Sequence, residues 1–331
     1  MIEKKIKIAI CGYGNLGKAV DNCILNYPDL KLEYVITRRD IVKIQSFTTA
    51  MVIDFNNFVD NIHTYKDKID VVILCGGSAT DLVVHGPIFS KYFNTIDSFD
   101  IHEKIPDYLK MIDDIAKANY NLSCISVGWD PGLFSINRIY ANAILPTGYT
   151  NTFWGRGVSQ GHSNAIKKIV GVKNAVQYTI PNDEIIDKVR NTNSQIFTKR
   201  QKHKRECFVV VEENADKNII ENQIKTMPNY FEDYDTIVHF VSEGELKTNH
   251  DKLSHAGVVI HSANIDGNRQ VIEYSLKLDS NPTCTASILL TYARAIYHMR
   301  QNNITGAITV YDVAPILLSN KNRLDVITNF L

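Results

Sequence analysis

The fold of this chain is decided near its start by Ile6-Lys7-Ile8-Ala9-Ile10-Cys11 followed by Gly12-Tyr13-Gly14-Asn15-Leu16-Gly17. An apolar strand runs directly into a G-x-G-x-x-G loop, and a helical pattern follows. In a dinucleotide-binding loop the first glycine permits the tight turn, the second lets backbone approach a pyrophosphate, and the third lets the helix pack on the strand. The helix N-terminus offers free N–H groups and the positive end of its dipole to the phosphates. We therefore expect all six loop residues to bind a dinucleotide; the alternative is an ordinary glycine-rich turn.

Short apolar segments alternate with helical patterns through the first 127 residues. The predicted strands are Ile6–Cys11, Leu32–Ile36, Val71–Cys75, Asn94–Asp97 and Leu122–Ser126, with residues 50–53 left open as a further short strand. An apolar stripe from Leu16 to Tyr27 recurs at helical spacing, and residues 104–119 predict a second helix. This alternation is typical of an α/β fold with a Rossmann-type, doubly wound parallel sheet.

After Pro131 the pattern changes to longer strand-like runs with few helical patterns between them. A helix is predicted at Pro131–Leu145, and strands at Tyr149–Gly155, Ala175–Ile180, Cys207–Val211, Thr236–Ser242, Gly257–His261 and Val271–Leu278. These runs predict a second, α+β domain with a mixed or antiparallel sheet. We expect the helical segment Thr285–Arg300 to return to the first domain. Residues 1–127 plus about 282–331 would then bind the dinucleotide, and about 128–281 the substrate, with a cleft between them.

Bulk properties narrow the function. The chain has 331 residues, enough for about two domains. Lys+Arg and Asp+Glu both number 36, and the net charge of +0 argues against nucleic acid or a membrane surface as a partner. No apolar run approaches the roughly 20 residues that span a bilayer, and the early strand leaves no signal peptide to expect. Six scattered cysteines without C-x-x-C predict core residues of a cytoplasmic protein, with neither disulfides nor a metal site.

The end of the second predicted strand indicates which dinucleotide is bound. A site for NAD usually places an acidic residue about 20 residues after the glycines, on the ribose 2′-hydroxyl. Here the strand ends in Ile36-Thr37-Arg38-Arg39-Asp40. A guanidinium binds phosphate in a bidentate way and opposes the charge of a 2′-phosphate, so the sequence predicts NADP. Two solvated arginines are the alternative, and Asp40 keeps NAD open.

A second glycine loop follows the strand Val71–Cys75. It reads Cys75-Gly76-Gly77-Ser78-Ala79-Thr80-Asp81 and lies at the carboxyl end of a parallel strand, where open α/β sheets bind ligands. We expect Cys75–Thr80 to pass beside the nicotinamide ribose; the alternative is an ordinary turn between strand and helix.

Longer blocks carry a resemblance to a known family. They are Gly12–Gly17, Thr37–Arg39, Gly128–Gly132, Phe134–Arg138, Phe153–Gly155, Ser159–His162, Val176–Thr179, Lys204–Arg205, Cys207–Val209, Thr226–Pro228, Leu276–Pro282 and Val313–Pro315. Together they resemble the meso-diaminopimelate dehydrogenase family over almost the whole chain. Gly77 and Val127 depart from the bulkier or hydroxylated residues expected beside the site, which leaves fine substrate preference open.

The resemblance implies a reaction. The family catalyses the reversible, NADP-dependent oxidative deamination of meso-2,6-diaminopimelate at its D-configured carbon. The products are ammonia and L-2-amino-6-oxopimelate, which cyclises to tetrahydrodipicolinate and serves lysine and cell-wall precursor synthesis. Family members are typically homodimers in which C-terminal residues complete the NADP domain and the rest provides dimerisation and substrate binding.

The resemblance also selects residues for the reacting end of the substrate. It implies that Asp100 contacts this end and that Asp130, with Gly128 and Trp129, lies beside the D-amino carbon. An aspartate there could orient an ammonium group or accept its proton. From the residues alone, Asp100 also reads as a helix N-cap with Glu103 in a capping box, and Asp130 as an N-cap before Pro131.

Further residues are assigned to the substrate cavity in the same way. The resemblance makes Trp154 a wall of the cleft, with Gln160 and Gly161 lining the same cavity, and Thr179 a hydroxyl donor to a carboxylate. The residues alone leave open a core aromatic at Trp154 and an exposed strand threonine at Thr179.

The remaining predicted groups bind the carboxylates and the distal end of the substrate. The resemblance selects Arg205 as a carboxylate clamp, a role that suits guanidinium geometry, and places Asn281 at the distal, L-configured end. We expect His255 to donate a hydrogen bond to the distal carboxylate. The run Thr198–Arg205 alone would read as a solvated basic face, and Asn281 as a turn residue. The histidines around His255 lack the spacing of a zinc helix.

Two other functions remain open at this point. One is another reductase of the aspartate pathway, such as a dihydrodipicolinate reductase, which lacks the blocks at 128–132 and 153–155. The other is a non-catalytic NADP-sensing regulator, which would need a helix-turn-helix or a basic arm, and neither is evident in the sequence.

Overall fold

The computed structural model describes residues 5–191 and 195–331. The chain forms two compact units. The first contains the residues up to Ile136 together with Pro282–Leu331, and the second contains Asn137–Asn281. The segment that begins with Pro282 therefore belongs to the first unit, although about 145 residues of chain separate the two parts.

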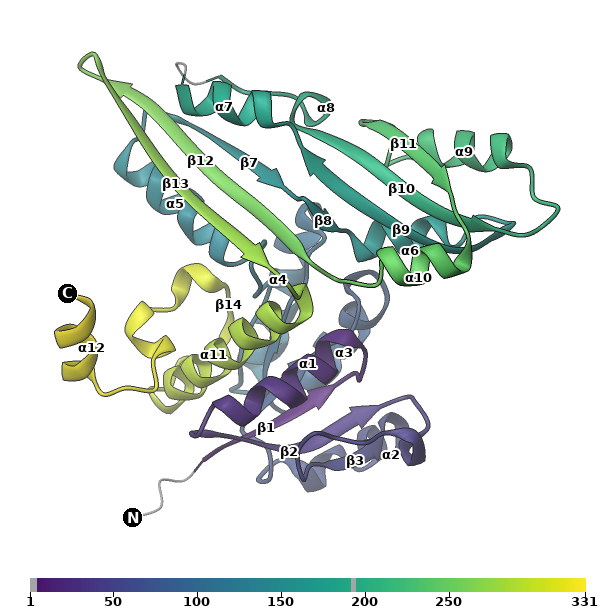
Figure 1. The fold of residues 1–331 in the computed structure, drawn as a ribbon. Helices are drawn as coiled ribbons and strands as arrows, with labels where there is room; N and C mark the ends of the chain where they lie inside the picture. Colours follow the sequence, from purple (N-terminus) through teal and green to yellow (C-terminus); the bar gives the residue numbers. More distant parts are fainter. Residues whose placement is uncertain (1–4, 192–194) are drawn as a thin grey trace. The chain divides into compact units, whose positions relative to one another are not determined.

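A seven-stranded parallel sheet forms the centre of the first unit (Figure 1). Its strands are β1 (Ile6–Cys11), β2 (Leu30–Thr37), β3 (Met51–Asp54), β4 (Val71–Leu74), β5 (Asn94–Asp97), β6 (Leu122–Cys124) and β14 (Gly306–Ile308). They lie in the order β3-β2-β1-β4-β5-β6-β14. The first six follow the order of a doubly wound dinucleotide-binding sheet, which confirms the predicted fold class. β14, a three-residue strand that the sequence pattern did not indicate, extends the edge.

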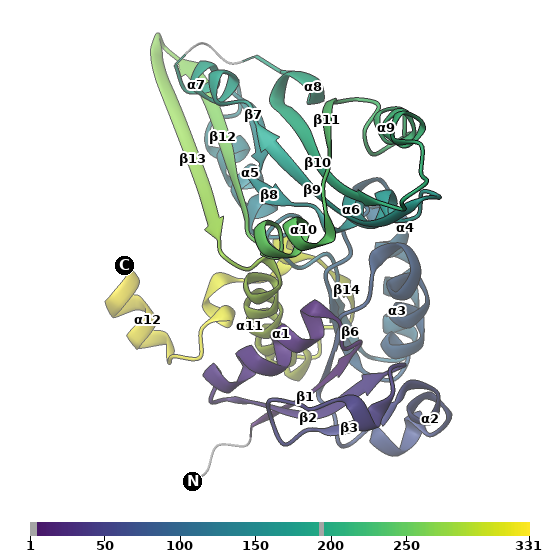
Figure 2. The same cartoon turned by 45° about the vertical axis from the view of Figure 1, so that its right-hand side comes forward.

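Helices cover both faces of this sheet. They are α1 (Asn15–Cys23), α2 (Phe55–Asp60), α3 (Val83–Ser90), α4 (Ile105–Ala118), α11 (Asn281–Gln301) and the peripheral α12 (Arg323–Phe330). α1 and α11 lie side by side on one face, with α3 and α4 on the other (Figures 1 and 2). The Tyr27 hydroxyl donates to the Ser287 carbonyl at 3.2 Å, and Arg294 pairs with Asp29. These contacts hold α11 to the N-terminal part of the chain.

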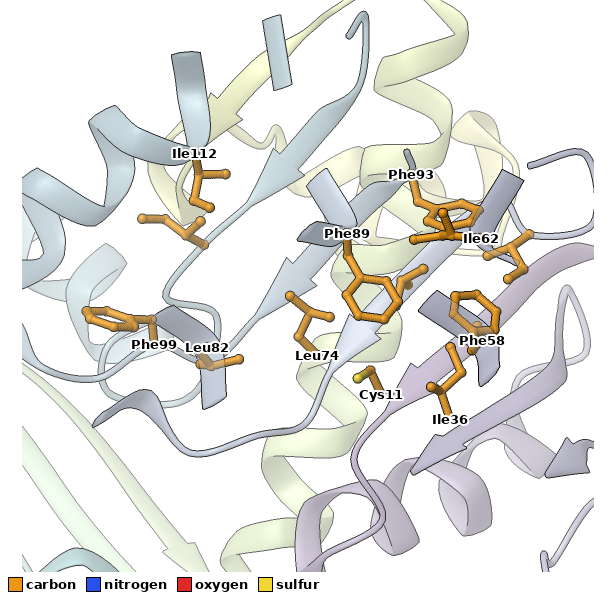
Figure 3. Close-up of a cluster of buried hydrophobic side chains, with 14 of the residues drawn as sticks. Cys11, Ile36, Phe58, Ile62, Leu74, Leu82, Phe89, Phe93, Phe99 and Ile112 are labelled. Atoms are coloured by element: carbon orange, nitrogen blue, oxygen red, sulfur yellow. The ribbon is translucent and has the colours of Figure 1, made fainter. Parts of the chain in front are cut away.

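An apolar core fills the space between the sheet and the helices on the α3 side (Figure 3). Cys11, Ile36 and Leu74 point into it from the strands, and Phe58 and Phe89 from α2 and α3. Each side chain is 1% exposed or less, and burying a large apolar side chain contributes roughly 1.5–3 kcal/mol. The strands are apolar on both faces because helices cover both.

Two predicted elements end earlier than the sequence indicated. α1 ends at Cys23 and gives way to a short 3-10 turn, because Pro28 disfavours helical backbone at Tyr27, which is extended at φ −115° and ψ 91°. β6 ends at Cys124 rather than Ser126, because Ser126 has left-handed backbone with φ 59°. This turn directs the following loop along the carboxyl edge of the sheet.

The second unit contains two sheets rather than one. The first is three-stranded and antiparallel, β13-β12-β7, and the second is four-stranded and mixed, β11-β10-β9-β8. The strands are β7 (Tyr149–Trp154), β8 (Gly157–Val158), β9 (Val172–Pro181), β10 (His203–Val211), β11 (Asp235–Phe240), β12 (His255–Ile265) and β13 (Asn268–Leu278). The predicted strands are confirmed, and their division between two sheets is new.

Short helices accompany these sheets. They are α5 (Leu133–Ile144), which begins in the first unit, and α6 (Gln160–Ile166), α7 (Asp183–Asn191), α8 (Lys199–Lys202), α9 (Lys217–Lys225) and α10 (Glu243–Asn249). The sequence shows few helical patterns in this part of the chain. α6 to α10 span only four to nine residues each, too short to show clear apolar periodicity.

Candidate functional site

The two glycine loops meet where the strand order reverses, between β1 and β4. The amide of Cys75 donates to the carbonyl of Cys11 at 2.8 Å, which joins the two strand ends. Gly12 has φ +103°, and a β-carbon at Gly17 would overlap the carbonyl oxygen of Gly12. Both positions therefore require glycine, one for the turn and one for the close approach of α1 to β1.

The loop leaves room for a phosphate. A β-carbon at Gly14 would meet no atom within 4 Å, so backbone at this position faces open space. α1 begins at Asn15, immediately beyond it, and Leu16 occupies the first turn. Its free N–H groups and dipole favour an anion there. The loop Gly12–Gly17 therefore fits the pyrophosphate of a dinucleotide.

A pocket of about 430 Å³ opens beside the end of β2. Its lining residues are Tyr13, Lys18, Arg39, Asp40, Lys43, Ile44 and Gln45. Three cations and one carboxylate make it suited to a phosphate ester. Arg39 was predicted for this role, whereas Lys18 and Lys43 were not, because a lone lysine on a helix or in a loop carries no distinguishing pattern.

The neighbours of Arg39 have other partners. Arg38 forms an ion pair with Asp81, whose carboxylate also accepts the amide of Gly77 at 3.1 Å. This pair joins the ends of β2 and β4. Thr37 is 2% exposed, and its hydroxyl oxygen accepts the amide of Arg39 at 3.1 Å. Only Arg39 of the predicted trio lines the pocket.

Asp21 on α1 holds the loop that forms one wall of this pocket. Its buried carboxylate accepts the Tyr13 hydroxyl at 2.7 Å, the Phe47 amide at 2.9 Å, and the hydroxyls of Ser46 and Thr48 at 2.9 and 3.0 Å. Burial and the contact with Asp21 raise the pKa of Tyr13. Four donors converging on one carboxylate fix the chain after Gln45 against α1.

Asp100 lies in the loop after β5, exposed to solvent. Its amide donates to the Ser78 hydroxyl oxygen at 3.1 Å, so the second glycine loop and the Asp100 loop are joined. The N-cap alternative was wrong, because the 3-10 turn His102–Lys104 follows Ile101 and has no side-chain cap. The carboxylate of Asp100 is therefore not needed for capping.

The loop after β6 carries the next group of predicted residues. Trp129 is 8% exposed and packs edge-on against Phe134, with ring centroids 5.2 Å apart. Gly128 is buried beside it, and Asp130 is partly exposed. The N-cap alternative for Asp130 was also wrong, because α5 begins at Leu133.

In the second unit, Arg205 is a buried cation with no acidic partner among the described residues. It is 7% exposed, and its pKa is lowered by burial. It donates to the Thr179 hydroxyl and lies 4.0 Å from the centre of the Tyr234 ring. Among the described residues no carboxylate pairs with it, and its Nε has no hydrogen-bond partner. The solvated-face alternative was wrong for Arg205, and the exposed-strand alternative was wrong for Thr179, which is 3% exposed.

Histidines gather around this guanidinium. Burial, with Arg205 as the next cause, lowers the pKa of His162 and of His203 to about 3. The pKa of His255 is lowered too, first by burial and also by Arg205. All three side chains are therefore neutral near pH 7 and do not add to the positive charge of Arg205.

His203 positions Trp154. The Trp154 amide donates to Nε2 of His203 at 2.9 Å, and the two rings stack with centroids 5.2 Å apart. Sequence reasoning missed His203. The alternation of buried residues at 203, 205 and 207 could have found it, because every second residue of a strand faces the same side. Trp154 is partly exposed rather than a core residue.

The other predicted residues of this unit lie nearby along the same strands. His255 begins β12, and its Nδ1 lies 2.8 Å from the carbonyl oxygen and 2.9 Å from the amide nitrogen of Ala256. The amide of Asn281, the first residue of α11, donates to the Leu253 carbonyl at 2.9 Å, which brings Asn281 to the segment before His255. Asn281 is therefore a helix-start residue.

The beginning of α6 contributes the last pair. Gln160 is the first residue of this helix, and Gly161 follows in an exposed position with no atom within 4 Å of where a β-carbon would be. The carbonyl of Gln177 on β9 accepts the amide of Ser159, which anchors the helix start to the sheet that carries Thr179 and Arg205.

In the part of the chain that the structure describes, no helix has the length and apolar character needed to cross a membrane.

Comparisons with known proteins agree with this arrangement. Residues 128–280 match the family model of the diaminopimelic acid dehydrogenase C-terminal domain. The chain is 54% identical over 323 residues to meso-diaminopimelate D-dehydrogenase of Ureibacillus thermosphaericus, covering 97% of this chain and 98% of that protein.

Solved structures show the same similarity. Diaminopimelate dehydrogenase of Corynebacterium glutamicum in complex with diaminopimelate matches with a TM-score of 0.92 and 41% identity over 100% of both chains. An engineered D-amino acid dehydrogenase bound to NADP+ matches with a TM-score of 0.88 and 40% identity, covering 99% of this chain and 100% of that one.

Proposed function

The chain belongs to the meso-diaminopimelate D-dehydrogenase family, and from this membership we propose that it deaminates meso-2,6-diaminopimelate oxidatively at the D-configured carbon, with NADP+ as the oxidant. The reaction releases ammonia and L-2-amino-6-oxopimelate, is reversible, and supplies tetrahydrodipicolinate to lysine and cell-wall precursor synthesis. Family membership argues against the reductase and regulator alternatives.

The observation that carries this proposal is the buried, unpaired guanidinium of Arg205. A buried cation is costly unless an anion and hydrogen bonds compensate it. Diaminopimelate brings two carboxylates, and one of them would pair with Arg205 and accept from the free Nε. The neutral histidines around it suit this role, because they leave Arg205 as the positive charge that a carboxylate would meet.

The cofactor follows from the first unit. Arg39, Lys18 and Lys43 would hold the 2′-phosphate in their pocket, and the Gly12–Gly17 loop the pyrophosphate. The residues Cys75–Thr80 follow the neighbouring strand β4 at the switch point, where they would border the nicotinamide ribose. NADP+, when bound, supplies the acceptor for the hydride from the D-carbon.

Asp100 and Asp130 would serve the reacting end. Both follow adjacent strands at the carboxyl edge of one sheet. Their carboxylates would hold the ammonium group of the D-centre and take up the proton that it loses as the carbon is oxidised. Trp129 and Gly128, both buried beside Asp130, would form a wall beside this carbon. Loss of the hydride leaves an iminium group, and one water must then add to the carbon so that ammonia leaves and the oxo group forms.

The distal end would be fixed by His255, Asn281 and Thr179. In the tautomer whose Nδ1 accepts the Ala256 amide, Nε2 of His255 carries the proton and can donate to a carboxylate. Trp154, Gln160 and Gly161 would line the space between the two ends. Fixing one end of a nearly symmetric substrate decides which centre reacts.

We also propose that residues up to about 127 plus 282–331 bind the cofactor, that 128–281 bind substrate and form a homodimer, and that the protein is cytoplasmic. Exposed apolar residues on α5 and β7 support the dimer, namely Ile139, Tyr140, Ile144 and Tyr149. Light scattering after gel filtration tests it: a mass near 75 kDa is expected from a 37.4 kDa chain, since twice 37.4 is about 75, and a single-chain mass would contradict it.

A direct assay tests the reaction. NADPH formation, followed at its absorbance band, is expected with meso-diaminopimelate and NADP+. The LL-isomer, which has no D-centre, is the control and is expected to give none. No NADPH with the meso compound would overturn the proposal, and faster reduction of NAD+ than of NADP+ would overturn the cofactor assignment.

A further inference from the structure

Asp97, at the end of β5, has a buried carboxylate that the proposed mechanism does not use. We propose that Asp97 is a positioning residue that ties together the two loops carrying Asp100 and Asp130. This inference rests on the proposed function of those two aspartates. It assigns Asp97 no contact with substrate, because the side chain is 2% exposed.

The contacts of Asp97 connect the loops directly. Its Oδ1 accepts the amide of Phe99 at 3.0 Å, in the Asp100 loop, and the amide of Ser126 at 3.1 Å, at the start of the loop that leads to Asp130. Its backbone carbonyl accepts the amide of Val127 at 2.8 Å. One residue therefore holds three backbone amides in two segments that are 27 residues or more apart in the sequence.

Tyr108 on α4 holds the Asp97 carboxylate in place. The Tyr108 hydroxyl on α4 donates to Oδ2 at 2.9 Å, and the Tyr108 ring stacks on Phe99 with centroids 4.2 Å apart. Asp97 thus has donors on both oxygens and cannot rotate without breaking a hydrogen bond in one loop or on α4.

Ser126 shows why a tie is needed. Its φ of 59° lies in the left-handed region, which a residue with a side chain rarely adopts. The hydrogen bond from its amide to Asp97 holds this turn, and the turn sets the direction of residues 127–130. On the other side, Phe99 is held by Asp97 while Asp100 is held by Ser78, so the Asp100 loop has two adjacent anchors.

The ionisation of Asp97 is consistent with this role. Burial raises the pKa of Asp97 to about 6, while the donors Phe99, Ser126 and Tyr108 lower it. The carboxylate is therefore charged near pH 7, and a charged acceptor forms stronger hydrogen bonds with backbone amides than a neutral one does.

Two variants and a control test the proposal in the full-length protein. Asp97→Ala removes the acceptor. Asp97→Asn keeps an oxygen for both amides and turns an NH₂ toward Tyr108, whose oxygen can accept it. Asp70→Ala is the matched control, because this carboxylate accepts a backbone amide, that of Lys7, at 2.8 Å but precedes β4, at the opposite edge of the same sheet.

We expect kcat for meso-diaminopimelate to fall about 100-fold in Asp97→Ala, the cost of misplacing reacting groups by about 1 Å. KM for diaminopimelate should change less than tenfold, because Arg205 and the distal groups are untouched, and the Kd of NADP+ less than threefold. Asp97→Asn should recover kcat to within about tenfold of wild type, and Asp70→Ala should keep it within threefold.

Hydrogen exchange provides a readout that does not depend on activity. In Asp97→Ala the amides of residues 98–100 and 126–130 should exchange at least tenfold faster, and in Asp70→Ala they should not. Three results would each overturn the proposal. They are unchanged exchange of these amides in Asp97→Ala, a kcat of Asp97→Ala within threefold of wild type, and no recovery of kcat in Asp97→Asn. A wild-type protein that does not oxidise meso-diaminopimelate would overturn the proposed function instead, and exchange would still decide the role of Asp97.

Discussion

Arg205 and Arg200 belong to one basic run but occupy different environments. Arg205 is buried on a strand face, whereas the Arg200 side chain is 56% exposed and pairs with Asp235 at the surface. Surface pairs of this kind contribute about 0–1 kcal/mol. The buried guanidinium of Arg205, by contrast, pairs with no carboxylate of the described residues, and the substrate would bring one.

This contrast gives a paired prediction. Arg205→Gln should raise KM for meso-diaminopimelate about 100-fold, because a buried, charge-assisted pair is worth about 3 kcal/mol. The Kd of NADP+ should stay unchanged. Steady-state kinetics and a fluorescence titration measure both quantities. Arg200→Gln is the control, and an equal loss in the two variants would show that only general positive charge matters.

The two adjacent arginines after β2 also differ. Arg39 lines the basic pocket, whereas Arg38 pairs with Asp81. We expect Arg39→Gln to weaken NADP+ binding about 30-fold with little effect on NAD+, because a guanidinium–phosphate contact is worth about 2 kcal/mol. Arg38→Gln should cost less than Arg39→Gln. Titration with 2′,5′-ADP isolates this end of the cofactor, and a larger loss in the Arg38 variant would contradict the assignment.

At the scale of elements, α1 does more than present its N-terminus. Its Asp21 anchors the segment Ser46–Thr48 and so fixes the preceding wall of the basic pocket. The predicted site residues of the first unit follow the ends of its strands. Side chains such as Asp21 and Asp97 join the loops there to one another and to the helices.

Asp21→Asn tests this anchor. An amide NH₂ would face donors where the carboxylate now accepts four hydrogen bonds, so the free energy of unfolding should fall by about 2 kcal/mol. NADP+ should bind several-fold more weakly, and amide exchange should rise at residues 46–48. Urea unfolding and hydrogen exchange provide these readouts. Asp114→Asn, in an exposed pair with Lys110, is the control. A loss of stability without weaker NADP+ binding would show that Asp21 stabilises the fold but does not shape the pocket.

At the scale of the whole molecule, buried ionisable groups make stability depend on pH. The pKa of His162 and of His203 is about 3 in the folded state, because of burial and then Arg205, and about 6.5 when unfolded. Each histidine therefore contributes to the free energy of unfolding above pH 6.5, and this contribution is lost as the pH falls. The loss is about 2 kcal/mol for each histidine at pH 5. Burial raises the pKa of Asp97 to about 6, so this group acts in the opposite direction. Its protonation adds about 1 kcal/mol to the free energy of unfolding at pH 5.

We therefore expect the free energy of unfolding to be lower at pH 5 than at pH 7.5 by a few kcal/mol. Urea titrations at the two pH values measure it. His203→Gln should reduce the difference between the free energies of unfolding at the two pH values. The matched control is His63→Gln, at an exposed position. A protein more stable at pH 5 would mean that the Asp97 contribution outweighs the histidines.

Local sequence pattern was enough to predict the βα unit at Ile6–Gly17, the parallel sheet around it and the basic residues after β2, of which Arg39 lines a pocket. These features have local causes, since a glycine at the turn, an apolar run and the spacing of a helix act over a few residues. Its blocks also indicated the family. Local pattern did not reveal the short helices of the second unit or β14, because so few residues carry little periodicity.

The folded structure, in contrast, sets which of the predicted residues share an environment. It distinguished Arg39 from Arg38, buried Arg205 among neutral histidines, removed Asp100 and Asp130 from the capping role, and revealed Asp97. The physical reason is that burial and ion pairing depend on partners far away in sequence. Asp81 lies 43 residues from Arg38, and Ser126 lies 29 residues from Asp97. The desolvation that makes each contact matter exists only once the chain has folded.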